Sequence, residues 1–220
     1  MNTAKVSEPL PKENPDDLQP LPRSFYVPSA REVAPKLLGH WLVRRTVAGI
    51  MAGRIVETEA YLREDPACHG YRGVTPRTAV MFGPPGRAYV YFIYGNHWCF
   101  NTVCCPRGVG EAVLVRAIEP VFGLEQMAVL RPGRGGVELT NGPGKFSQAL
   151  GVDRALDGAD LTRFDSPIFV ARNAARAAWL DGNGPVITTV RIGITAAADW
   201  PLRFYVAGSR WASGRRARSS

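Results

Sequence analysis

Runs of apolar residues, broken at glycine, proline and asparagine, divide the chain into short segments. Residues 30–43 start as a helix after Ser29, a residue type that caps helix N-termini, and continue as a strand after the break at Gly39. Two more helices are predicted at 123–130 and 145–150. Six runs rich in β-branched and aromatic residues predict strands, at 49–62, 87–95, 97–105, 111–120, 167–172 and 201–208.

Most of these strands follow one another at hairpin distances, which are too short for the crossovers that parallel pairing requires. The dipeptide at 95–96, Gly-Asn, fits a tight hairpin between two aromatic-rich strands. The pattern therefore predicts an α+β fold with a mostly antiparallel sheet, flanking helices and a hairpin. At 220 residues, the chain suits one domain with a sizeable core.

The two ends of the chain differ from its centre in composition. Residues 1–22 contain five prolines and are net acidic, so we expect a disordered N-terminal segment. Residues 212–220 form a basic tail that can touch phosphates without sequence preference. The packed domain is expected to span 23–211.

The net charge makes a polyanionic partner plausible without establishing one. The formal charge is +8 and the pI is near 9.7, and basic side chains gain affinity for phosphates by releasing counterions. Many basic proteins nevertheless bind no nucleic acid. Four cysteines without CxxC spacing are expected to be reduced and buried, which argues against a metal site.

No segment predicts insertion in a membrane or export. Apolar runs stay below the roughly 18 residues that a membrane span requires, and the N-terminus lacks the apolar core of a secretory signal. We expect a cytoplasmic, nucleoid-associated protein if the source is bacterial and a nuclear one if it is eukaryotic. The arginine- and alanine-rich composition favours a bacterial source.

Two carboxylates share one face of the predicted strand at 54–62. Alternation places Glu57, Glu59, Ile55 and Tyr61 on the same side. A solvated outer face of an antiparallel sheet would explain this pattern equally well. The alternative is a carboxylate desolvated beside an aromatic ring, which suits a general base near neutral pH.

Tyrosines in the predicted hairpin are candidates for contacts with a nucleotide. Tyr94 falls at the hairpin tip, where a rigid ring can wedge into a base stack and fill the gap left by an extruded nucleotide. Tyr91 points to the opposite face and can stack on that nucleotide. Most other aromatics of these strands are expected to belong to the core.

Two further side chains are candidates for the same site. His69 lies in a turn-rich loop soon after the carboxylate strand, although a lone histidine is more often structural. Arg116 interrupts an apolar run, and a buried arginine needs a partner. That partner would be a carboxylate of the 55–61 strand, unless Arg116 faces solvent from an edge strand.

The chain resembles the methylpurine DNA glycosylases of the mammalian type, also called alkyladenine or 3-methyladenine DNA glycosylases. Seven blocks carry the resemblance, in order across residues 23–211: GRIVETEAY at 53–61, His69 in its loop, MFGPPGRAYVYFIYG at 81–95, Asn101, VLVRAIEP at 113–120, NGPGKFSQALG at 141–151 and PLRFYVAGS at 201–209.

The resemblance implies a base-excision-repair enzyme that flips a damaged purine out of duplex DNA. Glu59 would be the general base that deprotonates the attacking water, and Arg116 would help to hold that water and the carboxylate. Whether Glu57 shares this work stays open. Hydrolysis would be monofunctional and leave an abasic site, because the matched pocket contains no lysine that could form a Schiff base.

The same resemblance implies how the base is held. Tyr61, His69 and Tyr91 would form stacking walls, with the backbone amide of His69 reading the purine edge. Tyr94 would replace the flipped base in the stack, and Asn101 would crowd the exocyclic amino group of normal guanine. Expected substrates are 3-methyladenine, 7-methylguanine, hypoxanthine and ethenoadenine in double-stranded DNA, with their order of preference open.

The family fold implied by the resemblance is a single compact domain around a curved antiparallel sheet, a monomer without metal or organic cofactor. Two other functions compete with this interpretation. One is a DNA-binding protein that recognises distorted duplex through the same tyrosine but performs no chemistry. The other is a hydrolase for free nucleosides or RNA, in which the basic surface is incidental.

Overall fold

The structure, a computed structural model, describes residues 14–93 and 95–213. All its strand pairs in that part are antiparallel, and six strands follow the order β3-β4-β5-β2-β1-β6, while β8 pairs with both β2 and β7. The elements are α1 (Ala30–Leu37), β1 (Trp41–Thr46), β2 (Gly49–Tyr61), β3 (Ala88–Ile93), β4 (His97–Cys104), β5 (Glu111–Phe122), α2 (Leu124–Leu130), α3 (Pro143–Ala149), β6 (Ile168–Ala171), α4 (Arg176–Asn183), β7 (Val186–Thr189) and β8 (Arg203–Val206).

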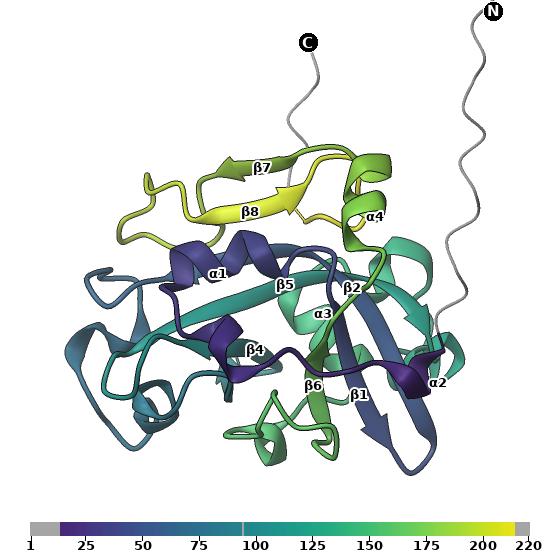
Figure 1. Cartoon of the computed structure of the whole chain (residues 1–220), viewed down its shortest axis with the longest axis horizontal. Helices are drawn as coiled ribbons and strands as arrows, with labels where there is room; N and C mark the ends of the chain where they lie inside the picture. The colour runs from purple at the N-terminus through teal and green to yellow at the C-terminus, as the bar shows by residue number, and fades with distance from the viewer. Residues whose placement is uncertain (1–13, 94, 214–220) are drawn as a thin grey trace, which may run out of the picture.

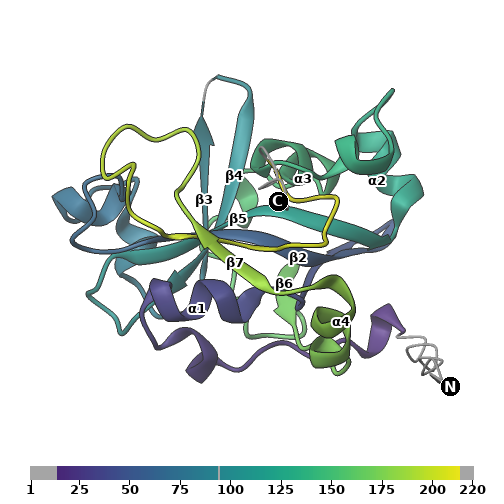
Figure 2. The same ribbon diagram turned by 90° about the horizontal axis from the view of Figure 1, so that it is seen from above.

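The sheet is curved and flanked by helices, so the predicted α+β fold is confirmed (Figure 1). Seen from above, β3 and β4 extend away from the body as a hairpin, and the segment between β7 and β8 lies beside them (Figure 2). This protruding hairpin and that segment border the cavity described below.

β2 occupies the centre of the sheet, paired with β1, β5 and β8. Its Val56 and Ala60 belong to the main hydrophobic core together with Leu37 of α1, and Thr58 donates from its hydroxyl to the carbonyl of Ala34 (2.9 Å). The opposite face carries Glu57, Glu59 and Tyr61. β2 is therefore the element on which core and site meet.

The alternation expected along β2 fails at Ile55. This residue packs in the main core with its neighbour Val56, instead of sharing the face of Glu57. The cause is a change of register, because the pairing of β2 with β5 shifts between Ile55 and Glu57. Such a bulge adds one residue to a strand and interrupts its alternation.

The start of α1 also differs in detail from the prediction. Ser29 occupies the N-cap position, but its side chain makes no capping hydrogen bond with the helix. The amide of Ala30 donates instead to Oε2 of Glu111 in β5 (2.9 Å). A carboxylate there also suits the partial positive charge of a helix N-terminus, so a remote residue caps the helix.

Residues 14–22 were expected to be disordered, yet the structure packs them against the sheet. Leu18 and Leu21 are buried, and the amide of Leu21 donates to the carbonyl of Val170 in β6 (2.8 Å). Leu21 packs in the main core and Leu18 in a second apolar cluster with side chains of β1 and β6, so buried apolar surface attaches this proline-rich segment together with its backbone pairing to β6. Residues 1–13 lie outside the described part of the chain.

All four cysteines, Cys68, Cys99, Cys104 and Cys105, are buried. Within residues 14–93 and 95–213, no helix is long and apolar enough to cross a membrane. The same residues contain no group of three or more histidine, cysteine, aspartate or glutamate side chains arranged to hold a metal ion.

Candidate active site

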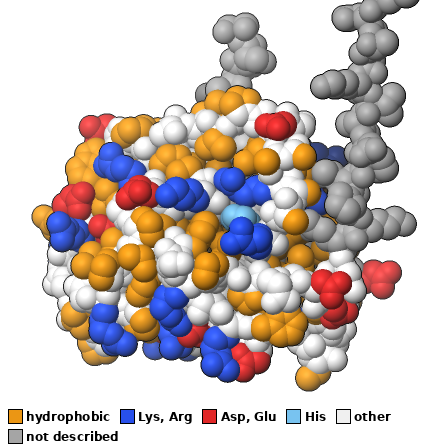
Figure 3. Space-filling model, viewed as in Figure 1, with side chains coloured by type: hydrophobic (Ala, Val, Ile, Leu, Met, Phe, Trp, Pro, Cys, Tyr) orange, Lys and Arg blue, Asp and Glu red, His pale blue; other side chains and the backbone are white. Residues whose placement is uncertain are grey.

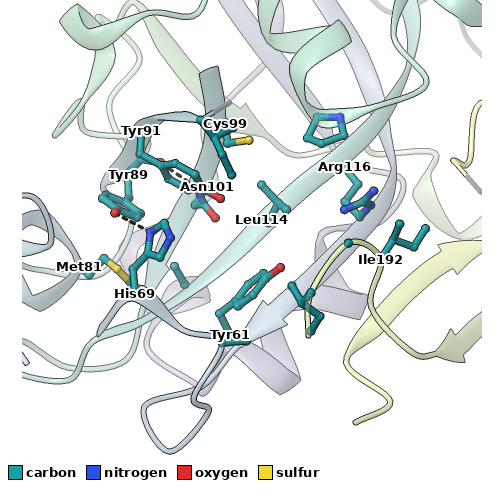
Figure 4. A pocket seen from close by; sticks show the side chains of 16 residues that line it. Tyr61, His69, Met81, Tyr89, Tyr91, Cys99, Asn101, Leu114, Arg116 and Ile192 are labelled. Atoms are coloured by element: carbon teal, nitrogen blue, oxygen red, sulfur yellow. Dashed lines mark hydrogen bonds between the residues drawn. The ribbon is translucent and has the colours of Figure 1, made fainter. Parts of the chain in front are cut away.

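A cavity of about 260 Å³ opens between β3, β4, β5, the end of β2 and the segment that follows β7. Figure 4 shows its aromatic, apolar and polar side chains converging from these elements. Its lining is Tyr61, Ala67, His69, Met81, Tyr89, Tyr91, Ile93, Cys99, Asn101, Ala112, Leu114, Arg116, Pro143, Ile192, Gly193 and Ile194. Five of the predicted site residues, Tyr61, His69, Tyr91, Asn101 and Arg116, are among them.

Aromatic rings form two walls of this cavity. His69 and Tyr91 pack edge to face with their ring centroids 4.5 Å apart, and His69 Nδ1 lies 2.9 Å from the hydroxyl of Tyr89. Tyr61 stands on the other side, at the end of β2 (Figure 4). Arg77 lies over the ring of Tyr91, 5.3 Å from its centroid.

His69 is neutral at physiological pH. Burial, assisted by the nearby charge of Arg77, lowers the pKa of His69 to about 4. The wall that it forms therefore carries no positive charge of its own, and it does not repel a cationic ring beside it.

Glu59 is fully buried and lies behind the cavity lining. Its Oε1 accepts from the backbone amide of Ile192 (2.9 Å) and lies 3.3 Å from Nη1 of Arg116. Its Oε2 accepts from the hydroxyl of Tyr61 (2.9 Å). All three partners line the cavity, so they join the carboxylate to the space in which a ligand would sit.

The hydroxyl of Tyr61 is a permanent donor to this carboxylate. Burial and the charge of Glu59 raise the pKa of Tyr61 far above its usual value. The guanidinium of Arg191, which pairs with the buried Asp65, lies over the Tyr61 ring at 4.7 Å from its centroid. The ring of Tyr61 is thus fixed at its hydroxyl and on one face.

Glu57, two residues earlier, has different partners. Its Oε1 accepts from Nε of Arg203 (2.6 Å), and its Oε2 accepts from the backbone amide of Ser213 (2.6 Å). Glu57 is fully buried and does not line the cavity. Strand alternation places both carboxylates on the same face, but their hydrogen-bond partners differ.

Arg116 connects the two carboxylates. Its Nη1 faces Glu59, and its Nε lies 3.4 Å from Oε1 of Glu57. Burial alone would lower the pKa of Arg116, but the two carboxylates outweigh this and raise it. The guanidinium is buried among carboxylates of the 55–61 strand and does not face solvent.

Asn101 and Tyr94 complete the predicted set. Asn101 is buried on β4, and its side-chain amide donates to the carbonyl of Tyr89 (3.1 Å), which orients the group toward the cavity wall. Tyr94 lies outside the described residues. Its proposed position at the tip of the hairpin stays a prediction.

The sequence did not predict the residues that bind Glu57, Glu59 and Tyr61 outside the predicted set, or that pair with those that do, which are Asp65, Arg191, Ile192 and Arg203. A signal for two of them exists, because Arg191 and Arg203 interrupt apolar runs in the same way as Arg116. Ile192 contributes its backbone amide, for which its side chain gives no signal.

Comparison with known proteins identifies one family across this site. The family described as methylpurine-DNA glycosylase (MPG) matches residues 24–210. A relative from Methanoculleus marisnigri is 52% identical over 195 residues, covering 89% of this chain and 99% of its own. A relative from Carboxydothermus hydrogenoformans is 47% identical, and the match covers 88% of this chain and 98% of its own. A relative from Rhodopseudomonas palustris is 45% identical, and the match covers 97% of this chain and 98% of its own. All three are named "Putative 3-methyladenine DNA glycosylase", and they come from an archaeon and bacteria rather than mammals.

Proposed function

The chain belongs to the methylpurine-DNA glycosylase family, and we propose that it releases alkylated and deaminated purines from double-stranded DNA. The damaged base enters the cavity after flipping out of the duplex. A water activated by Glu59 then hydrolyses the N-glycosidic bond and leaves an abasic site. The protein acts as a monomer without a metal or organic cofactor, in the cytoplasm of a bacterium and near its nucleoid.

One observation carries this proposal: a fully buried carboxylate lies directly behind an aromatic cavity. Glu59 accepts hydrogen bonds from Tyr61 and from the amide of Ile192, and Arg116 lies beside it. These contacts fix the orientation of the carboxylate toward the cavity. An ionised carboxylate can take a proton from water and also stabilise the oxocarbenium-like sugar that forms as the bond breaks.

The cavity suits a single heterocyclic base. Its volume of about 260 Å³ lies just below the range of about 300–1,000 Å³ that drug-sized ligands occupy. Alkylation puts positive charge on a purine, and such a ring stacks well on the electron-rich faces of Tyr61 and Tyr91. The neutral His69 adds a wall without repulsion, and its backbone amide reads the purine edge.

Discrimination against normal bases follows from shape and from chemistry. The side chain of Asn101, held by the carbonyl of Tyr89, crowds the exocyclic amino group of guanine. Alkylated bases also leave more readily, so the lesion itself contributes selectivity. The lining of the cavity, as far as the structure describes it, contains no lysine, which agrees with hydrolysis by water rather than through a Schiff base.

DNA contacts outside the cavity involve the hairpin and the basic surface. We propose that Tyr94 fills the gap in the base stack while the nucleotide is flipped out. On the face seen in Figure 3, lysine and arginine side chains form several separate groups instead of one continuous stripe. Charge on that face therefore does not locate a DNA path by itself, and the cavity is the better guide.

The test is base release from duplexes that each carry 3-methyladenine, 7-methylguanine, hypoxanthine or ethenoadenine, read as strand cleavage after alkaline treatment. Glu59→Gln should bind the lesion duplex as wild type does while release slows by roughly a thousandfold, the scale of lost general-base catalysis. Glu125→Gln, an exposed change of the same kind on α2, is the matched control.

Three outcomes would contradict the proposal. Release by Glu59→Gln at the wild-type rate would remove Glu59 from the mechanism. Binding of lesion duplex without any release by the wild type would identify a recognition protein. Equal rates with free damaged nucleosides would identify a nucleoside hydrolase, since base flipping requires a duplex.

A further inference from the structure

Glu57 is a second buried carboxylate beside the reacting one, and the proposed mechanism does not use it. Two adjacent carboxylates repel each other and compete for any cation between them. Here that cation is Arg116, which lies 3.3 Å from Glu59 and 3.4 Å from Glu57. If Glu57 lacked other donors, it would draw Arg116 away from Glu59.

The other donors come from the end of the described chain. The backbone amide of Ser213 donates to Oε2 of Glu57 (2.6 Å), while Arg203 donates both to Oε1 of Glu57 and to the carbonyl of Ser213. The hydroxyl of Ser213 also accepts from Nε of Arg116 (3.4 Å). Ser213 thus contacts all three members of the Glu57 network.

The segment 209–213 is anchored so that it can deliver these groups. Ser209 is buried, and its hydroxyl accepts from the amide of Trp211 (3.3 Å). Trp211 packs against the main core. The side chain of Arg210 lies over the ring of Trp211, 4.5 Å from its centroid.

We infer that the segment 209–213 is a positioning element of the active site, and that Glu57 is a positioning residue. By satisfying Glu57, Ser213 and Arg203 leave one edge of the Arg116 guanidinium free to face Glu59. This inference rests on the proposed function, because it assigns the segment to the same hydrolysis. It also gives Glu57 a role other than proton transfer.

Ser213→Pro tests the inference because proline lacks the amide hydrogen and every charge stays in place. We expect the single-turnover rate of base release to fall roughly tenfold, as expected when a catalytic group is misplaced by a fraction of an ångström. The dissociation constant for the lesion duplex should stay at its wild-type value. Ser213→Ala keeps the amide and should lose far less of the rate.

A slower single-turnover rate at an unchanged dissociation constant separates positioning from a loss of folded protein, which would weaken the apparent binding as well. Arg203→Lys loosens the same segment from the other side, because lysine lacks the planar fork of donors. It should reproduce the slower rate at an unchanged dissociation constant. Arg31→Lys, an exposed change of the same kind on α1, is the control.

The substrate is the lesion duplex that the wild type cleaves fastest, and thermal unfolding shows that each variant is folded. Single-turnover rates of Ser213→Pro and Arg203→Lys equal to that of Arg31→Lys would overturn the inference and leave the proposed function intact. A wild type that releases no base from any of the four duplexes would overturn both.

Discussion

The two faces of β2 are built on different physical principles. Toward α1, the strand presents Val56 and Ala60 to an apolar core, whose contacts are non-directional. Toward the cavity, it presents Glu57 and Glu59, which are equally buried but must be matched by donors. The core face needs only apolar side chains of suitable size, whereas the cavity face needs specific partners.

Those partners balance the charge. Three buried carboxylates, those of Glu57, Glu59 and Asp65, face three guanidinium groups from distant parts of the chain, those of Arg116, Arg191 and Arg203. Replacing a whole buried ion pair by apolar residues can leave the stability of the fold unchanged, but removing one member leaves the other charge buried without a partner. The cavity face is therefore the more sensitive of the two to a single substitution.

The sharpest test of this difference is Asp65→Asn. Asp65 and Arg191 are fully buried and paired, so the change leaves Arg191 without its counter-charge and should lower the free energy of unfolding by about 3–5 kcal/mol. Urea denaturation measures the effect. Base release should also slow, since Arg191 fixes Tyr61 and precedes the amide that binds Glu59.

Asp165→Asn is the control for that change. Asp165 pairs with Arg163 on the surface, where both side chains are more than half exposed. Solvent screens such pairs, so its unfolding curve should overlay that of the wild type. A similar response of the two variants would mean that burial does not distinguish the cavity network from the surface.

Leu37→Ala probes the apolar face. Leu37 is fully buried where α1 packs on β2, and its truncation should destabilise the fold by about 2–5 kcal/mol, the usual cost of such a cavity. The single-turnover rate of the folded variant should stay unchanged. Val129→Ala, at a side chain that is 79% exposed, should leave both quantities unchanged. A loss of base-release rate in Leu37→Ala as large as that in Asp65→Asn would mean that the two faces of β2 do not differ in their effect on the site.

The same contrast explains how much of the fold the sequence predicts. Long aromatic or β-branched runs predicted β2, β3, β4 and β5 to within a few residues, because a buried strand requires apolar residues that are consecutive or alternate in the sequence. α4 and β7 were not predicted. α4 ends in Asp-Gly-Asn, a weak helix sequence, and β7 is four residues long and pairs with β8.

The site was harder to predict than the sheet. The pattern of β2 identified Glu57 and Glu59 as a pair, but the choice between them came from the resemblance. In the structure the two carboxylates differ in their partners, because Glu59 binds the backbone amide of Ile192 and Glu57 that of Ser213, each more than a hundred positions away. No local pattern encodes such partners. The packing of residues 14–22 was missed for a related reason, since composition does not show where two leucines find a sheet edge.

The smallest predicted effect concerns two histidines, the half-buried His69 beside the cavity and the buried His40 near α1. Burial and nearby arginines lower the pKa of His69, beside the cavity, and of His40, near α1, to about 4. In the unfolded chain, both titrate near 6.5. As the pH falls from about 6.5 to 4, these histidines take up protons in the unfolded state but not in the folded state, so the free energy of unfolding decreases over this window.

Replacing either histidine removes its share of that loss. His69→Gln and His40→Gln should each show a smaller decrease in the free energy of unfolding between pH 6.5 and pH 4 than the wild type, measured by urea denaturation at several pH values. All other titrating groups act in each protein, so the difference from wild type isolates one imidazole. His40 Nδ1 accepts from the amide of Asn173 (3.1 Å), a bond that its protonation breaks. A pH dependence in His69→Gln as steep as in wild type, with a flatter one in His40→Gln, would mean that the cavity hydrates and protonates its histidine without loss, unlike the core.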